Sequence, residues 1–200
     1  MLAPATGSQP SRHLLMLPLP RAVEVRLEDQ FLPSLGATRP VMGFHISIIG
    51  PFFWTTADTA EPLARLREVC AQTRLPQLVI HGIDIIENAP DDCAVFLTVR
   101  PVRVLRSLQQ SLLQVLGNTI TPQYHRAGPF RPHITIGLGL PSRVAQTLGK
   151  SAASSFHACL DVAELWLVEQ RHQSPWRSLL ALSLGSAAEP RGLDAESADG

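Results

Sequence analysis

Two short segments of the chain each carry a histidine followed, two residues later, by a residue with a hydroxyl group. The first is FHISIIGPF, with His45 and Ser47, and the second is RPHITIGLGL, with His133 and Thr135. Both run into apolar residues typical of β-strands, where residues two apart share a face. We therefore expect each histidine to share one face of a strand with its hydroxyl, while the intervening isoleucines pack on the other.

This combination of side chains is suited to proton transfer at a phosphate. A histidine with a pKa of about 6.5 can take or give a proton at neutral pH. Two histidines on opposite sides of one phosphorus would act as general base and general acid, each worth roughly 10²–10⁴ in rate. Ser47 and Thr135 would donate hydrogen bonds to the non-bridging oxygens, where charge grows in the transition state. One His-x-Ser pattern usually has no functional meaning, whereas two copies favour a catalytic role.

No metal or cofactor is required by this arrangement, and none is expected. The sequence has no HExxH motif, no cluster of acidic ligands and no GxxxxGK[ST] loop. Two histidines with hydroxyl groups would be a poor ligand set for zinc. Metal ligation is therefore the weakest of the hypotheses considered.

The bulk composition limits the kinds of partner. The chain has 200 residues, 45% of them hydrophobic, and a formal net charge of zero. A neutral protein is not suited to binding long nucleic acid through a broad phosphate-contacting surface, but a few arginines can hold a small anion. No apolar run approaches the roughly 18 residues of a membrane-spanning helix, and no signal peptide is evident. We expect a soluble, cytoplasmic protein with no membrane or obligate protein partner.

The three cysteines, Cys70, Cys93 and Cys159, are far apart, odd in number and lie beside apolar runs. This pattern predicts buried, reduced thiols, as is usual in the cytoplasm.

Hydrophobic periodicity and turn residues predict one folded domain over residues 12–184, between flexible tails at 1–11 and 185–200. Expected strands lie at about 13–17, 44–49, 78–86, 94–99, 132–138, 156–170 (as one strand or two) and 176–184. Expected helices lie at 21–35, at 58–73 behind a capping box of Asp58 and Glu61, at 101–117 and at 141–148.

Glycine and proline residues predict where several of these elements end. Pro33 would end the first helix early, and Gly149 would close the last one. Gly50-Pro51 would stop the first motif strand and leave residues 52–54 in a loop.

Several residues near the motifs are candidates for substrate binding. Arg131 lies two residues before His133 and would clamp a phosphate, unless it is an ordinary surface arginine. Phe52 and Trp54 follow the first motif, and Trp54 is the better candidate for stacking on a nucleobase. Core packing is the expected role for at least two of the three aromatic residues at 52–54. Tyr124, in the loop before the second motif with His125 and Arg126, would line the cleft or be solvated.

The paired motifs resemble the two-histidine (2H) phosphoesterase superfamily, which includes 2′-5′ RNA ligase-like proteins and 2′,3′-cyclic phosphodiesterases. The opening HLLMLPLP is also similar to that family's first strand. The resemblance implies an α+β, bilobal fold, with two pseudo-symmetric lobes whose antiparallel sheets surround a central cleft. It also implies that His45 and His133 are the acid–base pair and that Ser47 and Thr135 bind the phosphate. Ser47 stands where the family often has threonine, which keeps the donor and loses a methyl group.

The expected function is therefore that of a metal-independent phosphodiesterase, a hydrolase cleaving 2′,3′-cyclic or 2′-5′ phosphodiesters. RNA ends, short oligonucleotides and cyclic nucleotides are the expected substrates, with RNA processing as the setting. The alternative is a nucleotide- or RNA-binding module of the same fold with little or no turnover. The sequence leaves open whether hydrolysis or ligation prevails, which histidine is the base, and the oligomeric state.

Overall fold

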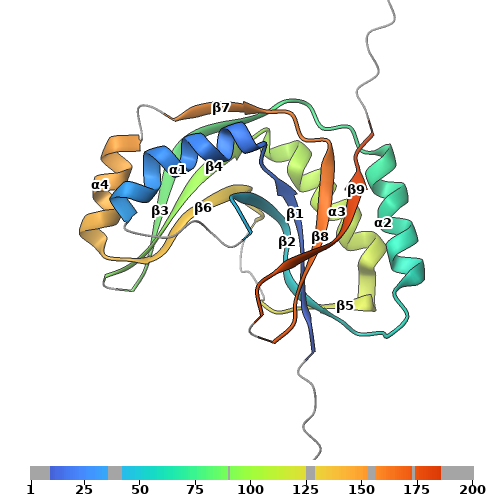
Figure 1. Cartoon of the computed structure of the whole chain (residues 1–200). Helices are drawn as coiled ribbons and strands as arrows, with labels where there is room; N and C mark the ends of the chain where they lie inside the picture. Colours follow the sequence, from blue (N-terminus) through green and yellow to red (C-terminus); the bar gives the residue numbers. More distant parts are fainter. Residues whose placement is uncertain are drawn as a thin grey trace, which may run out of the picture.

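The computed structural model describes residues 10–35, 42–89, 91–124, 129–152, 156–172 and 174–185. Within these ranges the chain forms one nine-stranded sheet and four α-helices (Figure 1). The elements in chain order are β1 (Arg12–Pro18), α1 (Arg21–Leu35), β2 (His45–Trp54), α2 (Ala60–Gln72), β3 (Leu78–Ala89), β4 (Asp92–Arg100), α3 (Val102–Leu116), the short 3₁₀ helix η1 (Gly117–Thr119), β5 (Ile120–Pro122), β6 (His133–Leu140), α4 (Ser142–Ala152), β7 (His157–Leu160), β8 (Glu164–Gln170) and β9 (Arg177–Ser183).

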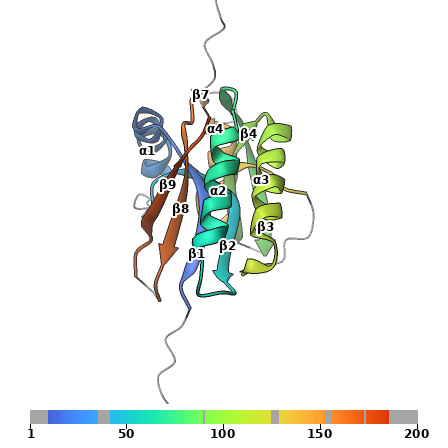
Figure 2. The ribbon, with the colours of Figure 1, turned by 90° about the vertical axis from the view of Figure 1, so that its right-hand side faces the viewer.

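The strand order places the two motif strands at the centre of the sheet. The order is β7-β3-β4-β6-β2-β1-β8-β9, with β5 paired to the far end of β2, and the neighbouring strands are antiparallel. Figure 1 shows the sheet bending, with α1 and α4 beside the β3–β4–β6 half and α2 and α3 beside the β1–β2–β8–β9 half. Figure 2 shows α2 and α3 side by side over their half. The predicted α+β class with antiparallel sheets is confirmed, and both lobes belong to one continuous sheet.

Alternation along the motif strands separates a packed face from a polar one. Ile46, Ile48 and Ile134 are 0% exposed and Ile136 is 4% exposed, whereas the histidines and hydroxyl residues between them are half-buried. The isoleucines belong to the main hydrophobic core. The helices contribute their apolar stripes to this core through Leu27, Phe31, Leu66, Leu105, Leu108, Leu112, Leu116, Ala145 and Leu148. The period-two pattern of the motifs was therefore a sound guide to which side chains face the core.

Two elements are longer than their proline residues predict. Helix α1 continues to Leu35 with Pro33 inside it, because a proline in the last turn removes only one helical hydrogen bond. Strand β2 continues through Gly50-Pro51 to Trp54, where β5 pairs with it. The neighbouring register with β1 is irregular here, and a proline is tolerated in a strand at such irregularities.

The ends of two helices also differ from the predictions. Helix α4 passes through Gly149, where a Cβ would lie 2.8 Å from Cδ1 of Ile85, so close packing on β3 accounts for this glycine. At the start of α2 the N-cap is Thr59 without a side-chain hydrogen bond, and Asp58 Oδ1 accepts the N–H of Ala60 at 3.0 Å. The predicted capping box with Glu61 is therefore not formed.

The cysteines are all free, but only two of them are buried. Burial raises the pKa of Cys70 to about 11, which leaves its thiol protonated and unreactive. Cys159 lies on the edge strand β7 and is exposed, so the prediction that it is buried is wrong. Apolar neighbours in the sequence do not show whether a short strand has a covered face.

No helix within the described ranges is both long and apolar enough to cross a membrane. Residues 1–9 and 186–200 lie outside the described residues. The flexible tails at 1–11 and 185–200, the domain boundaries at 12 and 184 and the cytoplasmic location therefore stay predictions.

The turn after β9 offers a test of packing. The Gly185 N–H donates to the carbonyls of Cys70 and Thr73 at the end of α2, at 3.1 and 2.9 Å. A Cβ at position 185 would lie 2.6 Å from the backbone oxygen of Ala71. We expect Gly185→Ala to lower the free energy of unfolding by about 1–3 kcal/mol, measured by urea denaturation. In the control Gly50→Ala the new Cβ meets no atom within 4 Å, and equal losses in both variants would contradict this account.

Candidate active site

The pairing of β2 with β6 brings the two motifs together on one face of the sheet. The central isoleucine of one motif is paired with the central isoleucine of the other. In an antiparallel pair this register places Thr135 opposite His45 and His133 opposite Ser47, with all four side chains on the same face. Each histidine thus lies across from the hydroxyl residue of the other motif. The sequence predicted that the four residues would meet, but not this exchange of partners.

Each histidine is held by a backbone carbonyl two residues earlier in the chain. The Nδ1 atom of His45 lies 3.2 Å from the oxygen of Gly43, and the Nδ1 atom of His133 lies 2.8 Å from the oxygen of Arg131. Since a carbonyl only accepts hydrogen bonds, Nδ1 carries a proton in both rings, whether the imidazole is neutral or charged. Nε2 is then the nitrogen that gains or loses a proton when the ring changes its charge.

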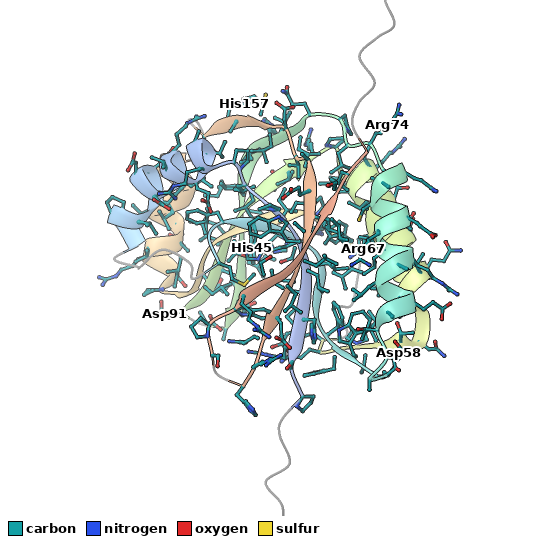
Figure 3. The ribbon with its side chains drawn as sticks, turned by 45° about the vertical axis from the view of Figure 1, so that its right-hand side comes forward. His45, Asp58, Arg67, Arg74, Asp91 and His157 are labelled. Carbon is teal, nitrogen blue, oxygen red and sulfur yellow. The ribbon has the colours of Figure 1, made fainter. Side chains whose placement is uncertain are left out.

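The carbonyl that holds His45 belongs to a glycine in a left-handed conformation. Gly43 has φ = +71°, which glycine adopts without the penalty of a Cβ. In Figure 3, His45 lies in the middle of the molecule, between the helix pair α1 and α4 and the helix pair α2 and α3. Sequence reasoning did not identify either carbonyl, because a backbone atom has no residue type. A glycine two residues before the first histidine was the available signal.

Phe96, which sequence reasoning also missed, contacts the second histidine. Phe96 on β4 is paired with Thr135, so it lies on the active face. Its ring centroid is 4.5 Å from that of His133, with an interplanar angle of 69°. This edge-to-face contact restricts rotation of the imidazole. In the sequence Phe96 is one apolar residue of a strand, and nothing there distinguishes it from its neighbours in the core.

The two histidines also influence each other electrostatically. Burial lowers the pKa of His45, and the positive charge of His133 lowers it further, while the hydrogen bond to the Gly43 carbonyl acts in the opposite direction. The net pKa of His45 lies below the ordinary value of 6.5. His45 is therefore neutral at neutral pH and can accept a proton.

Arg131 approaches the site mainly through its backbone. Its carbonyl holds His133, while its side chain is 75% exposed and places Nη1 3.9 Å from Oδ2 of Asp84. Asp84 is paired with Phe96, so this loose ion pair lies on the active face. The role of Arg131 as a phosphate clamp stays a prediction.

The structure contradicts the stacking role predicted for Phe52, which is 0% exposed and belongs to the main core. Its ring stacks on that of His13, with 5.7 Å between centroids, and meets the ring of Trp54 edge-on at 5.3 Å. Trp54 is half-buried and packs against the same core. Core packing, the role expected for at least two of the three aromatic residues at 52–54, describes both side chains.

Tyr124 is 61% exposed, and its hydroxyl accepts a hydrogen bond from Nε2 of Gln123 at 3.1 Å. It follows β5, which is paired with the end of β2 away from His45. Its binding role stays a prediction. His125 and Arg126, the other candidates in this loop, lie outside the described residues.

No group of three or more His, Cys, Asp or Glu residues in the described part of the chain could hold a metal ion. The chemistry that the motifs offer on this face is that of two imidazoles, two hydroxyls and the arginine beside them.

Comparisons with known proteins show which family and which fold this chain resembles. A sequence model of the 2′-5′ RNA ligase superfamily matches residues 24–174, which include both motifs. Among solved structures, TT0787 of Thermus thermophilus is similar with a TM-score of 0.57 and 19% identity, covering 88% of this chain and 100% of that one. E. coli LigT complexed with 3′-AMP has a TM-score of 0.54 and 17% identity, covering 89% and 100%.

Usb1 of Kluyveromyces marxianus is similar with a TM-score of 0.51 and 12% identity, covering 87% of this chain and 98% of that one. At such identities the similarity establishes the fold. No curated protein sequence matches the chain.

The mutual effect of the two histidines can be measured. We expect the pKa of His45, followed by NMR of its imidazole, to lie below 6.5 and to rise in His133→Gln, because the positive charge that opposes its protonation is removed. The control His157→Gln changes an exposed histidine on β7 and should leave the pKa of His45 unchanged. A pKa of His45 above 6.5, or one that falls in His133→Gln, would contradict this account of the site.

Proposed function

The chain belongs to the 2′-5′ RNA ligase superfamily, and we propose that it is a phosphodiesterase that cleaves 2′,3′-cyclic or 2′-5′ phosphodiesters without a metal ion. Membership of this superfamily makes it a phosphoesterase of the two-histidine kind, acting on RNA or nucleotides. The observation that carries the finer proposal is the geometry of the motifs. Two imidazoles, each held through Nδ1 by a backbone carbonyl, and two hydroxyls share one face of adjacent strands.

In the proposed reaction His45 acts as the base in hydrolysis, because its lowered pKa keeps it neutral. Its Nε2 takes a proton from water as the water oxygen attacks phosphorus. The bond from phosphorus to one ribose oxygen breaks on the opposite side, and His133, which enters the step as the imidazolium, gives its Nε2 proton to that oxygen. One P–O bond forms and one breaks, and the two histidines have exchanged protonation states. In a ligation reaction the same steps run in reverse and the roles exchange.

Ser47 and Thr135 are proposed to bind the two non-bridging oxygens of the phosphate. Each hydroxyl residue follows one histidine by two positions on its own strand and lies opposite the other histidine on the neighbouring strand. The hydroxyls can therefore donate hydrogen bonds to the phosphate while the histidines act on the entering and leaving oxygens. Such donors are most valuable where negative charge increases in the transition state. Arg131, whose guanidinium is exposed beside this face, would add a positive charge near the phosphate.

Short substrates are favoured over long RNA. The chain has no net charge, so it has no broad excess of positive charge to hold many phosphates. A structure of similar fold, E. coli LigT, has been determined with 3′-AMP, which is a ligand of that size. RNA ends, short oligonucleotides and cyclic nucleotides are therefore the proposed substrates, with RNA processing as the setting.

The first test is hydrolysis of a 2′,3′-cyclic nucleotide in the presence of EDTA. We expect turnover by the wild type, and kcat reduced by at least about 10²-fold in both His45→Ala and His133→Ala, because each removes one proton-transfer step. His157→Ala is the matched control and should retain full activity. Full activity in the double variant, or activity that needs an added divalent metal, would overturn the proposal. Ligand binding without any product, from cyclic or 2′-5′ linked substrates, would favour the binding module.

Ser47 can be tested separately from the histidines. We expect Ser47→Ala to lower kcat by roughly 10²-fold, with KM changing less, because the lost hydrogen bond strengthens in the transition state. Ser47→Thr keeps the hydroxyl and should retain a kcat close to that of the wild type. If Ser47→Ala and Ser47→Thr are equally impaired, crowding at this position rather than hydrogen bonding limits the reaction.

A further inference from the structure

A cavity of about 340 Å³ lies on the active face of the sheet, over β1 and β8. Its walls include Met16, Met42, Trp166, Val168 and Trp176. None of these residues was singled out from the sequence, where the methionines and tryptophans are scattered along the chain. We call this cavity the two-tryptophan pocket.

The pocket is continuous with the site that holds the histidines. Met16 is paired with Ser47, so the two lie on neighbouring strands about 4.8 Å apart. Gly43, whose carbonyl holds the His45 ring, also lines the pocket. A molecule seated against Met16 would therefore lie one strand away from a phosphate bound between the histidines, a gap that a ribose can span.

The side chains of the pocket form an apolar cluster of their own, away from the main core. Leu14, Met16 and Val168 are buried, and Met42, Trp166 and Trp176 pack on them while remaining partly exposed. Strand alternation places Met16 on the face opposite to the core residues Leu15 and Leu17. Two indoles and two thioethers thus offer an open apolar surface on a face whose centre is polar.

Both indoles are held in place by polar neighbours. The Trp166 Nε1 atom donates a hydrogen bond to Oε2 of Glu164 at 2.8 Å. The guanidinium carbon of Arg12 lies 5.7 Å from the centroid of the Trp176 ring, within the range of a cation–π contact. Rings that are held in this way present a surface for stacking without the entropic cost of being ordered by a ligand.

The charged groups of the pocket already have protein partners. Glu24 Oε1 accepts the N–H of Phe44 at 3.1 Å, and Arg177 donates from Nε and Nη2 to Glu169 at 2.9 and 2.7 Å. Beside these polar groups, the indoles and thioethers supply the apolar part of the surface that a ligand would meet. Such a surface suits a flat ring and discriminates weakly between patterns of hydrogen-bonding groups.

We propose that the two-tryptophan pocket binds the nucleobase of the nucleotide whose phosphate lies between His45 and His133. The inference rests on the proposed function for its orientation, and it adds a substrate preference. A cavity of about 340 Å³ is large enough for a purine, and stacking strength grows with ring area. The pocket therefore favours adenine and guanine about equally, and both over cytosine and uracil.

The test is calorimetric binding of adenosine 3′-monophosphate, cytidine 3′-monophosphate and inorganic phosphate. We expect Trp176→Ala to weaken binding of the adenosine nucleotide about ten-fold and to leave the affinity for inorganic phosphate unchanged. The control His157→Ala changes an exposed side chain on the edge strand β7, away from the pocket lining, and should change neither affinity. Wild type should bind the adenosine nucleotide several-fold more tightly than the cytidine nucleotide. Trp176→Phe should retain most of the affinity, because it keeps an aromatic ring.

Met42→Ala is a smaller change in the same wall and serves as a control for loss of folding. It should also weaken binding of the adenosine nucleotide without changing the affinity for inorganic phosphate. The proposal is overturned if the affinity for the adenosine nucleotide does not change in Trp176→Ala, or falls in parallel with that for inorganic phosphate. If Trp176→Ala turns over 2′,3′-cyclic nucleotides with KM and base preference unchanged, the proposed catalysis stands and the proposed nucleobase site is wrong. If the adenosine nucleotide binds in a way that depends on Trp176 but no substrate is turned over, the nucleobase site stands and the proposed catalysis is wrong.

Discussion

The structure depends above all on the antiparallel pairing of β2 with β6 at the centre of the sheet. In this register the central isoleucines of the two motifs face each other and enter the core, so the histidines and hydroxyls are forced to the opposite face. A slip of one residue would move every catalytic candidate of one strand into the core and expose its isoleucines, at a cost of several buried side chains. The hydrophobic core and the candidate site are therefore specified by the same contact. The remaining strands extend the sheet outward from this pair and supply its two curved halves.

Burial and backbone hydrogen bonding act on the histidines in opposite directions. Burial and a second imidazole disfavour the charged form of His45, while the Gly43 carbonyl favours it. The outcome is an imidazole that is neutral at neutral pH and is held in a defined orientation. His133 has the matching carbonyl and, in addition, the edge of Phe96. Two residues of the same type, in corresponding places of the two motifs, thus have different surroundings. In the proposed reaction this difference would let His45 accept a proton while His133 donates one.

The sequence predicted the elements whose signals are local and repeated. Alternation in the motif strands, the apolar stripe from Leu105 to Leu116 and the antiparallel pairing of β3 with β4 were all predicted and are all present in the structure. Predictions based on single glycines or prolines failed at Pro33, Pro51 and Gly149, because tertiary packing and strand pairing outweigh one residue's preference. Contacts between distant segments were not predictable from one sequence. The contact of Phe96 with His133 and the gathering of the tryptophans near Met16 depend on strand order and register, which periodicity does not reveal.

Strand β1 shows how a departure from alternation can point to function. Its run HLLMLP is apolar at every position from Leu14 to Leu17, and all four residues are buried. A continuous run of this kind is typical of a strand covered on both faces. Here Leu15 and Leu17 face the main core, whereas Leu14 and Met16 face the cluster of methionines and tryptophans beside the histidines. The second apolar face adjoins Ser47 and is covered by side chains that are themselves partly exposed. An antiparallel strand of an open sheet ordinarily needs only one apolar face, and the second one on β1 provides the floor of the pocket proposed to bind the nucleobase.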